Sequence, residues 1–222
     1  AFASGQLKEK PAVDPRLEAY ATLLRRESPI HVHSNYPSEI RTALDLAKEF
    51  NLRITIGHGN YAYRVADDLK AAGVIPVVGP TFLVQSYDED TWHNGPAELA
   101  AAGIDVALQM DMRAQHNKVF LEVGAMLVRF GMKEDDAMKA LTINGAKAIL
   151  MEDRIGSLEP GKDADVVLLD GHPFSLQASV THTFIDGKLE FELRQKAQPA
   201  ALTAVAVTRP IATRATTAST RL

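Results

Sequence analysis

The sequence contains no cysteine, and this absence removes several classes of chemistry. Disulfide bonds, thiolate metal sites and a cysteine nucleophile are excluded, while the cytoplasm and the periplasm both stay open as compartments. No apolar run approaches the roughly 18 residues that a membrane-spanning helix needs, so we expect a soluble protein with no membrane partner. Basic residues (24) do not outnumber acidic ones (28), which argues against a nucleic-acid surface.

A regular alternation of short β-branched segments and helical periodicity runs from residue 29 to residue 111. The predicted strands cover residues 29–33, 52–58, 74–80 and 104–111, and a predicted helix follows each of them. Repeated strand-helix units predict an α/β fold with a parallel sheet and right-handed crossovers. The connection 81–95 is longer than usual, and we expect a loop there whose Tyr87, Trp92 and His93 could line a pocket.

The C-terminal third has a different pattern of predicted secondary structure. Three short β-like runs, 165–169, 179–185 and 188–193, are separated by Gly, Pro and Asp turns, and Asp186 with Gly187 predicts a hairpin between the last two. From residue 196 the chain is rich in Ala and Thr, and we expect a disordered tail. The expected divisions are therefore an α/β body over 1–151, a β module over 152–195 and the tail 196–222.

Three residues with metal-ligating side chains stand at the carboxyl ends of predicted strands. His33 ends PIHVH, the start of the stretch PIHVHSN, while His58 ends LRITIGH and Asp111 ends IDVALQMD. Parallel sheets carry their sites at this edge, and neutral imidazoles with a carboxylate suit Zn²⁺. A single His at the end of a strand is more often structural, but two histidines and an aspartate at equivalent positions favour a metal site. His31 is expected to pack or support the site from below.

One segment carries a specific family resemblance. TINGAKAILMEDRIGSLEPGKDADVVLLDGHPF (142–174), with TFIDGKLEFE after it, resembles the C-terminal region of the metal-dependent amidohydrolase superfamily, in its imidazolonepropionase-like and prolidase-like group. HVHSNYPSEIRTALDLAKEFNLRITIGHG is similar to the fifth and sixth barrel strands of that family. The resemblance covers about residues 10–193. It implies the C-terminal half of a TIM-like (β/α)8 barrel, strands five to eight, plus part of a small β-sandwich domain.

The resemblance also implies a site and a reaction. His33 and His58 would be metal ligands, and Asp111 would be both a ligand and the catalytic proton shuttle. The cofactor would be a divalent metal ion such as Zn²⁺, with one or two ions in the complete site of the family. The implied function is metal-dependent hydrolysis of linear or cyclic amide bonds in a small-molecule or peptide substrate. The alternative is a non-catalytic α/β binding or assembly module on the same scaffold. His172 and His182 are expected not to be ligands.

The sequence departs from the family pattern at several positions. The most similar subgroup has a second His where Asn35 stands, an acid where Tyr61 stands, and His-Pro where Met112 and Arg113 stand. A first-strand His pair and a fourth-strand bridging carboxylate have no counterpart before Ile30. Four barrel strands would leave two edges unpaired. We therefore expect a partial chain, a completing second chain or a homo-oligomer, with at most one weakly held metal ion and no turnover by these 222 residues alone.

Overall fold

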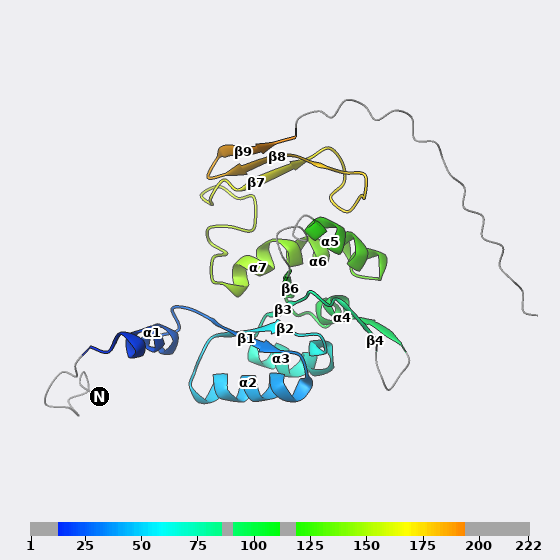
Figure 1. Ribbon diagram of the computed structural model, residues 1–222. Helices are drawn as coiled ribbons and strands as arrows, with labels where there is room; N and C mark the ends of the chain where they lie inside the picture. Colours follow the sequence, from blue (N-terminus) through cyan, green and yellow to red (C-terminus); the bar gives the residue numbers. More distant parts are fainter. Residues whose placement is uncertain (1–12, 86–90, 112–118, 194–222) are drawn as a thin grey trace, which may run out of the picture. The chain divides into compact units, whose positions relative to one another are not determined.

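The computed structural model describes residues 13–85, 91–111 and 119–193 (Figure 1). The chain divides into two compact units, Ala1–Glu192 and Leu193–Leu222, and every described residue except Leu193 belongs to the first. Among the described residues, no helix has the length and apolar character needed to cross a membrane. The expected tail from residue 196 lies outside the described residues.

A four-stranded parallel sheet forms the centre of the first unit. Its spatial order is β1-β2-β3-β6, and all three neighbouring pairs are parallel. The strands are β1 (Ile30–Ser34), β2 (Ile54–His58), β3 (Pro76–Val78) and β6 (Ala107–Leu108). The prediction of four parallel strands is confirmed, and with it the α/β class.

Two of the predicted strands were too long at their carboxyl ends. Strand β3 ends at Val78 because Gly79 has φ +135° and Pro80 has no amide hydrogen to donate. Strand β6 then ends at Leu108, since its neighbour β3 offers no further ladder. Asp111 consequently lies three residues after the end of β6, whereas the sequence predicted that it would be the last residue of the strand.

Helices on one side of the sheet close its core. Figure 1 shows α2 (Pro37–Glu49) and α3 (Ala66–Ala72) together beneath the strands. Helix α2 buries Ile40, Ala43 and Ala47, a spacing that places all three on one helical face. A short 3₁₀ turn, η1 (Ala62–Val65), precedes α3. The largest fully buried side chains include Ile40, Ile56, Leu69, Val78, Leu99, Val106 and Leu127.

The connection predicted as a loop over 81–95 contains a small antiparallel ribbon. Strand β4 (Leu83–Gln85) pairs with β5 (Trp92–Asn94). Asn94 then begins α4 (Gly95–Ala101), because its Oδ1 accepts a hydrogen bond from the Ala97 amide at 3.2 Å. Three-residue strands carry too little alternation to stand out in a sequence, and this ribbon was missed.

The remaining helices are α1 (Pro15–Leu24), α5 (Phe120–Arg129), α6 (Glu134–Leu141) and α7 (Ile143–Ala148). Helix α1 was not predicted. The single helix predicted over 134–150 is interrupted at Thr142, whose φ of −132° and ψ of −98° lie outside the helical region. The Thr142 hydroxyl donates back to the Met138 carbonyl oxygen at 2.7 Å, a local bond that competes with continuing the helix.

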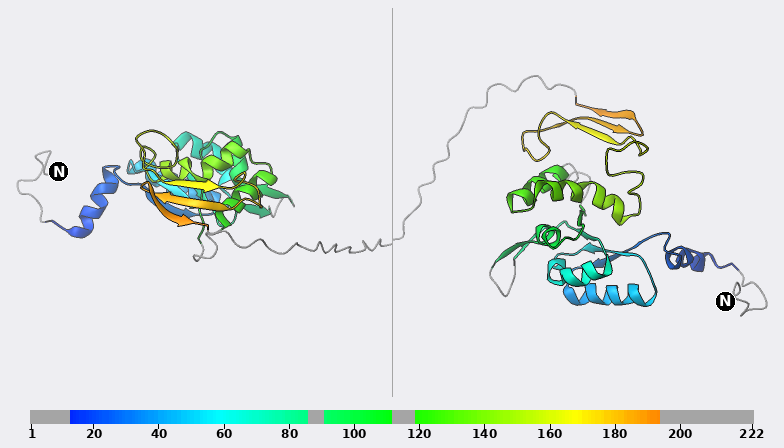
Figure 2. Two further views of the ribbon diagram at one scale, coloured as in Figure 1. Left: turned by 90° about the horizontal axis from the view of Figure 1, so that it is seen from above. Right: turned by 180° about the vertical axis from the view of Figure 1, so that it is seen from behind.

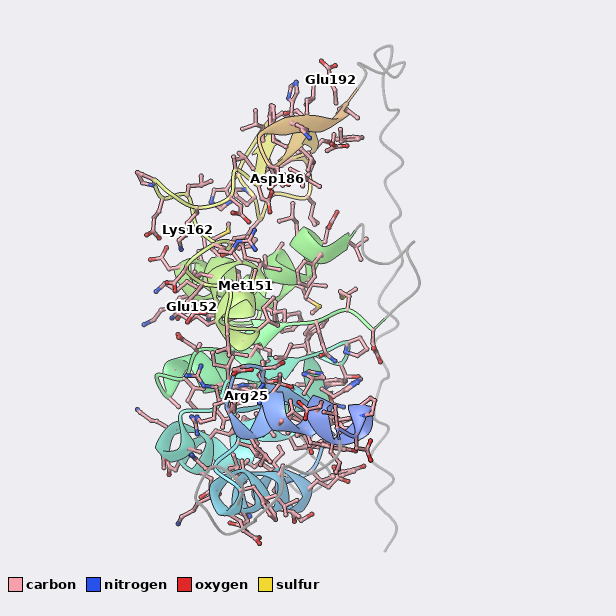
Figure 3. The ribbon with its side chains drawn as sticks, turned by 90° about the vertical axis from the view of Figure 1, so that its left-hand side faces the viewer. Arg25, Met151, Glu152, Lys162, Asp186 and Glu192 are labelled. Carbon is pink, nitrogen blue, oxygen red and sulfur yellow. The ribbon has the colours of Figure 1, made fainter. Side chains whose placement is uncertain are left out.

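The β module forms one sheet, as predicted, with strands β7 (Val166–Leu169), β8 (Val180–Ile185) and β9 (Lys188–Glu192), and both neighbouring pairs are antiparallel. Asp186 and Gly187 have φ of +50° and +73°, the positive pair that a tight two-residue hairpin requires. Figure 3 labels Asp186, in the turn between β8 and β9, and Glu192, the last residue of β9, and both views of Figure 2 show the three strands side by side. The predicted hairpin is confirmed.

A contact ties the segment after β7 to the helices. Phe174 packs against the core cluster, and its ring fills the space beside Gly124 of α5, where an added Cβ would come within 2.6 Å of Phe174 Cε1. Gly124 therefore lacks a side chain because an aromatic ring occupies that position.

Candidate functional site

Two histidines meet where strands β1 and β2 end. The imidazole rings of His33 and His58 have centroids 4.1 Å apart and planes tilted by 50°. The chain continues in parallel past the strands, because the Gly59 amide donates to the Ser34 carbonyl oxygen at 3.1 Å. The two histidines predicted as ligands are thus brought into direct contact.

Strand alternation alone would have separated these rings. In the sheet His33 lies opposite Gly57, whereas His58 lies opposite Ser34, so a regular β2 would direct the His58 side chain to the other face. His58, however, has φ +66°, in the left-handed region that non-glycine residues seldom occupy. This conformation turns the side chain toward His33. Such strained backbone costs on the order of 1 kcal/mol or more and is concentrated at functional sites.

Asp111 reaches the same point from two strands away. Its Oδ2 lies 3.4 Å from His58 Nε2, with the His58 side chain 16% exposed and the Asp111 side chain 61% exposed. This separation is a contact between an imidazole and a carboxylate that exceeds ordinary hydrogen-bond length. His58 is therefore the shared member of two pairs, one with His33 and one with Asp111.

The donor types at this point suit a borderline-soft divalent cation, since two imidazoles and one carboxylate are a common zinc set. The arrangement falls short of a closed site. Across residues 13–85, 91–111 and 119–193, no group of three or more His, Asp or Glu side chains is placed to hold one metal ion. The chain thus carries the donors as two contacts sharing His58, and their chemistry fits the metal better than their geometry does.

His31 occupies a defined place two residues before His33. Its Nδ1 is hydrogen-bonded to Thr55 Oγ1 at 2.9 Å, and Thr55 is only 5% exposed. The imidazole lies over Gly57, where an added Cβ would come 2.2 Å from His31 Nε2. His31 thus lies on the same face of the sheet as His33, and its supporting role stays a prediction.

Glu39 holds the loop that follows His33. Its Oε2 accepts hydrogen bonds from the backbone amides of Asn35 at 2.9 Å and Tyr36 at 3.2 Å. These two bonds, with a smaller contribution from the neighbouring His33, hold the pKa of Glu39 below its usual value. Sequence reasoning missed this residue, although a Glu in the first turn after Pro37 is a known capping signal.

Other residues named from the sequence lie apart from this point. His172 Nε2 lies 3.5 Å from Glu134 Oε2, and His182 Nδ1 is 3.0 Å from Thr181 Oγ1. His93 Nδ1 is hydrogen-bonded to Glu98 Oε1 at 2.8 Å. Tyr87, Met112 and Arg113 fall outside the described residues.

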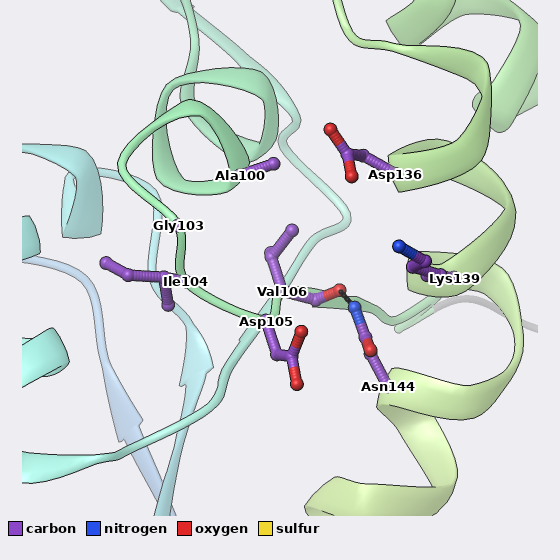
Figure 4. Close-up of a pocket in the computed structure, with 8 residues that line it drawn as sticks. All are labelled: Ala100, Gly103, Ile104, Asp105, Val106, Asp136, Lys139 and Asn144. Carbon is purple, nitrogen blue, oxygen red and sulfur yellow. Dashed lines mark hydrogen bonds between the residues drawn. The ribbon is translucent and has the colours of Figure 1, made fainter.

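Two cavities open at the opposite end of the sheet. One of about 150 Å³ is lined by Asp105, Val106, Asp136, Lys139 and Asn144 among others (Figure 4). Asn144 Nδ2 donates to the Val106 carbonyl oxygen at 3.0 Å. A second, of about 220 Å³, adjoins Arg53 and Ile54. Because these residues precede β6 and begin β2, both cavities lie at the amino ends of the strands, away from His33 and His58.

Comparison with known proteins gives consistent likenesses. The family described as "Amidohydrolase family" matches residues 89–189. An imidazolonepropionase of Picrophilus torridus is 28% identical over 152 residues, covering 65% of this chain and 38% of that protein. A 5-methylthioadenosine/S-adenosylhomocysteine deaminase of Teredinibacter turnerae is 44% identical over 91 residues, covering 36% and 21%.

A solved structure gives the same likeness over more of the chain. The crystal structure of an amidohydrolase from Thermotoga maritima is 34% identical and superposes with a TM-score of 0.77, covering 86% of this chain and 51% of that one. The chain therefore spans about half of this structure and less than half of the two curated relatives it matches.

Proposed function

Because the chain belongs to the amidohydrolase superfamily, we propose that it supplies part of the active site of a metal-dependent hydrolase that cleaves amide or related C–N bonds. The observation that carries this proposal is the meeting of His33, His58 and Asp111 at the carboxyl ends of three parallel strands. Chemistry in α/β folds is located at that edge.

Each of the three residues has a role in this proposal. His33 and His58 would hold the ion through neutral imidazole nitrogens, and Asp111 would complete the donor set from this chain. A bound divalent cation of the zinc kind acts as a Lewis acid towards a carbonyl and lowers the pKa of water. The Asp111 carboxylate, 3.4 Å from His58, would accept the proton of the attacking water and return it to the leaving nitrogen.

The proposal includes an architecture for the complete protein. We assign β1, β2, β3 and β6 to strands five to eight of a (β/α)8 barrel, and the β7-β8-β9 sheet to part of a β-sandwich domain. The support is that the chain covers 51% of the Thermotoga maritima structure while superposing on it well. The remaining ligands would come from elsewhere in the protein, from a completing chain or from a homo-oligomer. The division into 1–151, 152–195 and 196–222 remains a prediction.

Zinc titration of the purified 222-residue chain tests this proposal. Wild-type protein should bind one zinc ion, weakly, and His33→Ala and His58→Ala should each abolish that binding. His182→Ala is the matched control, since it removes an imidazole from the β module, and it should leave the isotherm unchanged. Tight stoichiometric binding that survives loss of both His33 and His58 would contradict the proposed site.

A second candidate function has one observation in its favour. Because the described residues contain no three-ligand cluster, the chain could be a non-catalytic binding or assembly module that keeps the scaffold. The same titration separates the two candidates. Absence of zinc binding by wild-type protein would favour the non-catalytic module, whereas histidine-dependent binding favours the hydrolase.

A further inference from the structure

The same four-residue pattern follows both strands that carry the histidine pair. The sequence reads HSNY at residues 33–36 and HGNY at residues 58–61. The two copies run side by side, because the Tyr61 amide donates to the Asn35 carbonyl oxygen at 3.1 Å. Each copy therefore places a histidine, an asparagine and a tyrosine next to their counterparts on the neighbouring strand.

The tyrosines form a stacked pair just as the histidines form a contact pair. The rings of Tyr36 and Tyr61 have centroids 5.6 Å apart and planes only 13° from parallel. Tyr36 is 56% exposed, so this pair ends in a ring accessible to solvent. Offset stacking of this kind is favourable between planar rings, so a solvent-accessible tyrosine ring is a surface on which a further planar ring can stack.

Two further rings lie beside this pair, and the first of them is tilted by 43° to the Tyr61 ring rather than stacked on it. The Tyr63 ring lies 6.4 Å from Tyr61, and the His93 ring of the β4-β5 ribbon is stacked on Tyr63 at 4.6 Å and 17°. Four rings from three segments of the chain thus form one row. Because Tyr36 lies three residues after His33, and an extended residue spans at most about 3.6 Å, the Cα atom of Tyr36 lies within about 11 Å of the Cα atom of His33.

The asparagines of the two copies supply an independent observation. The Oδ1 atoms of Asn35 and Asn60 are both buried, and neither has a hydrogen-bond partner. An unsatisfied buried acceptor is unfavourable, and a donor that reached it would relieve that cost. Two such oxygens lie between the histidines and the tyrosines along the chain, and both are shielded from solvent.

We propose that the two HxNY segments form a binding platform for the planar aromatic group of an aromatic amide substrate. The aromatic ring stacks on the exposed Tyr36, which Tyr61 supports from behind, and the attached amide group lies along the segment between the tyrosines and the two histidines. The inference deepens the proposed hydrolase function and rests on it for the role of the bound molecule as a substrate.

A matched pair of probes tests the platform on the full 222-residue chain. N-benzoylglycine carries a planar ring, and N-cyclohexanecarbonylglycine carries a ring of similar size that is not planar. Affinities measured by NMR titration should favour the benzoyl compound by about threefold to tenfold, the usual gain from aromatic stacking. Tyr36→Leu and Tyr61→Leu should each reduce this preference, and the double variant should abolish it.

Control variants separate stacking from loss of structure. Tyr36→Phe with Tyr61→Phe keeps the planar rings and should keep the preference. Tyr20→Leu removes an equally exposed tyrosine from α1 and should have no effect. Equal affinity for the two probes, no binding of either one to wild-type protein, or a preference that survives the double leucine variant would overturn the proposal.

Zinc titration of the same variants distinguishes this proposal from the proposed function. Histidine-dependent zinc binding without a ring preference would refute the platform and leave the metal site standing. A ring preference in a chain that binds no zinc would keep the platform as a binding site and refute the hydrolase function.

Discussion

Replacing Gly57 by alanine should destabilise the chain, because the imidazole of His31 occupies the space that the new methyl group needs. The added Cβ would lie 2.2 Å from His31 Nε2 and 2.6 Å from Cε1, far inside van der Waals contact. The backbone itself is no obstacle, since Gly57 is not among the residues with positive φ. Any cost therefore comes from the clash with His31.

The size of the effect follows from what His31 can do. The His31 side chain is exposed, so its ring can rotate away from the new methyl group. The destabilisation from overpacking is then smaller than the usual cost of about 1–3 kcal/mol. The ring then loses its 2.9 Å hydrogen bond to Thr55. Leaving the buried Thr55 hydroxyl without its partner costs about 1–3 kcal/mol. Alanine also reduces the conformational entropy of the unfolded chain, which stabilises the fold by about 0.4–1 kcal/mol. We therefore expect the unfolding free energy to fall by roughly 1–2 kcal/mol in total.

Urea denaturation followed by circular dichroism measures this loss, and a double-mutant cycle identifies its cause. In a His31→Ala background the clash is absent, and Gly57→Ala should become neutral or slightly stabilising. Gly145→Ala is the control, because nothing lies within 4 Å of the methyl group it would add, and it should not destabilise. Equal destabilisation by Gly57→Ala with and without His31 would refute the reasoning.

Three further predictions follow from the structure. The pKa of Glu39 is depressed in the folded chain, so its carboxylate stabilises the fold at pH values above its usual pKa of 4.5, and this stability is lost as the pH falls through the folded-state pKa. Glu39→Gln should therefore lower the unfolding free energy at neutral pH and have little effect in acid. Urea denaturation at both pH values measures the difference. Asn94 caps α4 and donates to the carbonyl oxygens of Leu127 and Phe130 at 3.0 and 3.2 Å, so Asn94→Ala should cost about 2–3 kcal/mol in the same assay. His172→Ala and His182→Ala should each leave the zinc isotherm of wild-type protein unchanged.

The regular parts of the fold could be predicted from the sequence because their signals are repeated. The alternation over residues 29–111 indicated parallel strands, and Asp186 with Gly187 indicated a hairpin. The β4-β5 ribbon could not be predicted, since three residues give no measurable period. The break at Thr142 was also missed, because a local side-chain bond ends the helix where the apolar spacing continues.

The candidate site was only partly readable. The rule that sites lie at the carboxyl ends of parallel strands singled out His33, His58 and Asp111. The contact between the His33 and His58 rings depends on the positive φ of His58. No residue pattern predicts this conformation, and strand alternation alone places the two side chains on opposite faces of the sheet. The HSNY and HGNY repeat, by contrast, is visible in the sequence, although only its histidines have the side chains of typical metal ligands.

Crystals of the 222-residue chain grown with zinc give the most direct test, through an anomalous difference map at the zinc absorption edge. The account predicts one peak bonded to imidazole nitrogens of both His33 and His58 at about 2.0–2.1 Å, with the Asp111 carboxylate beside it. A peak bound only elsewhere, for instance at His172 or His182, with the His33 and His58 rings free of metal, would contradict it.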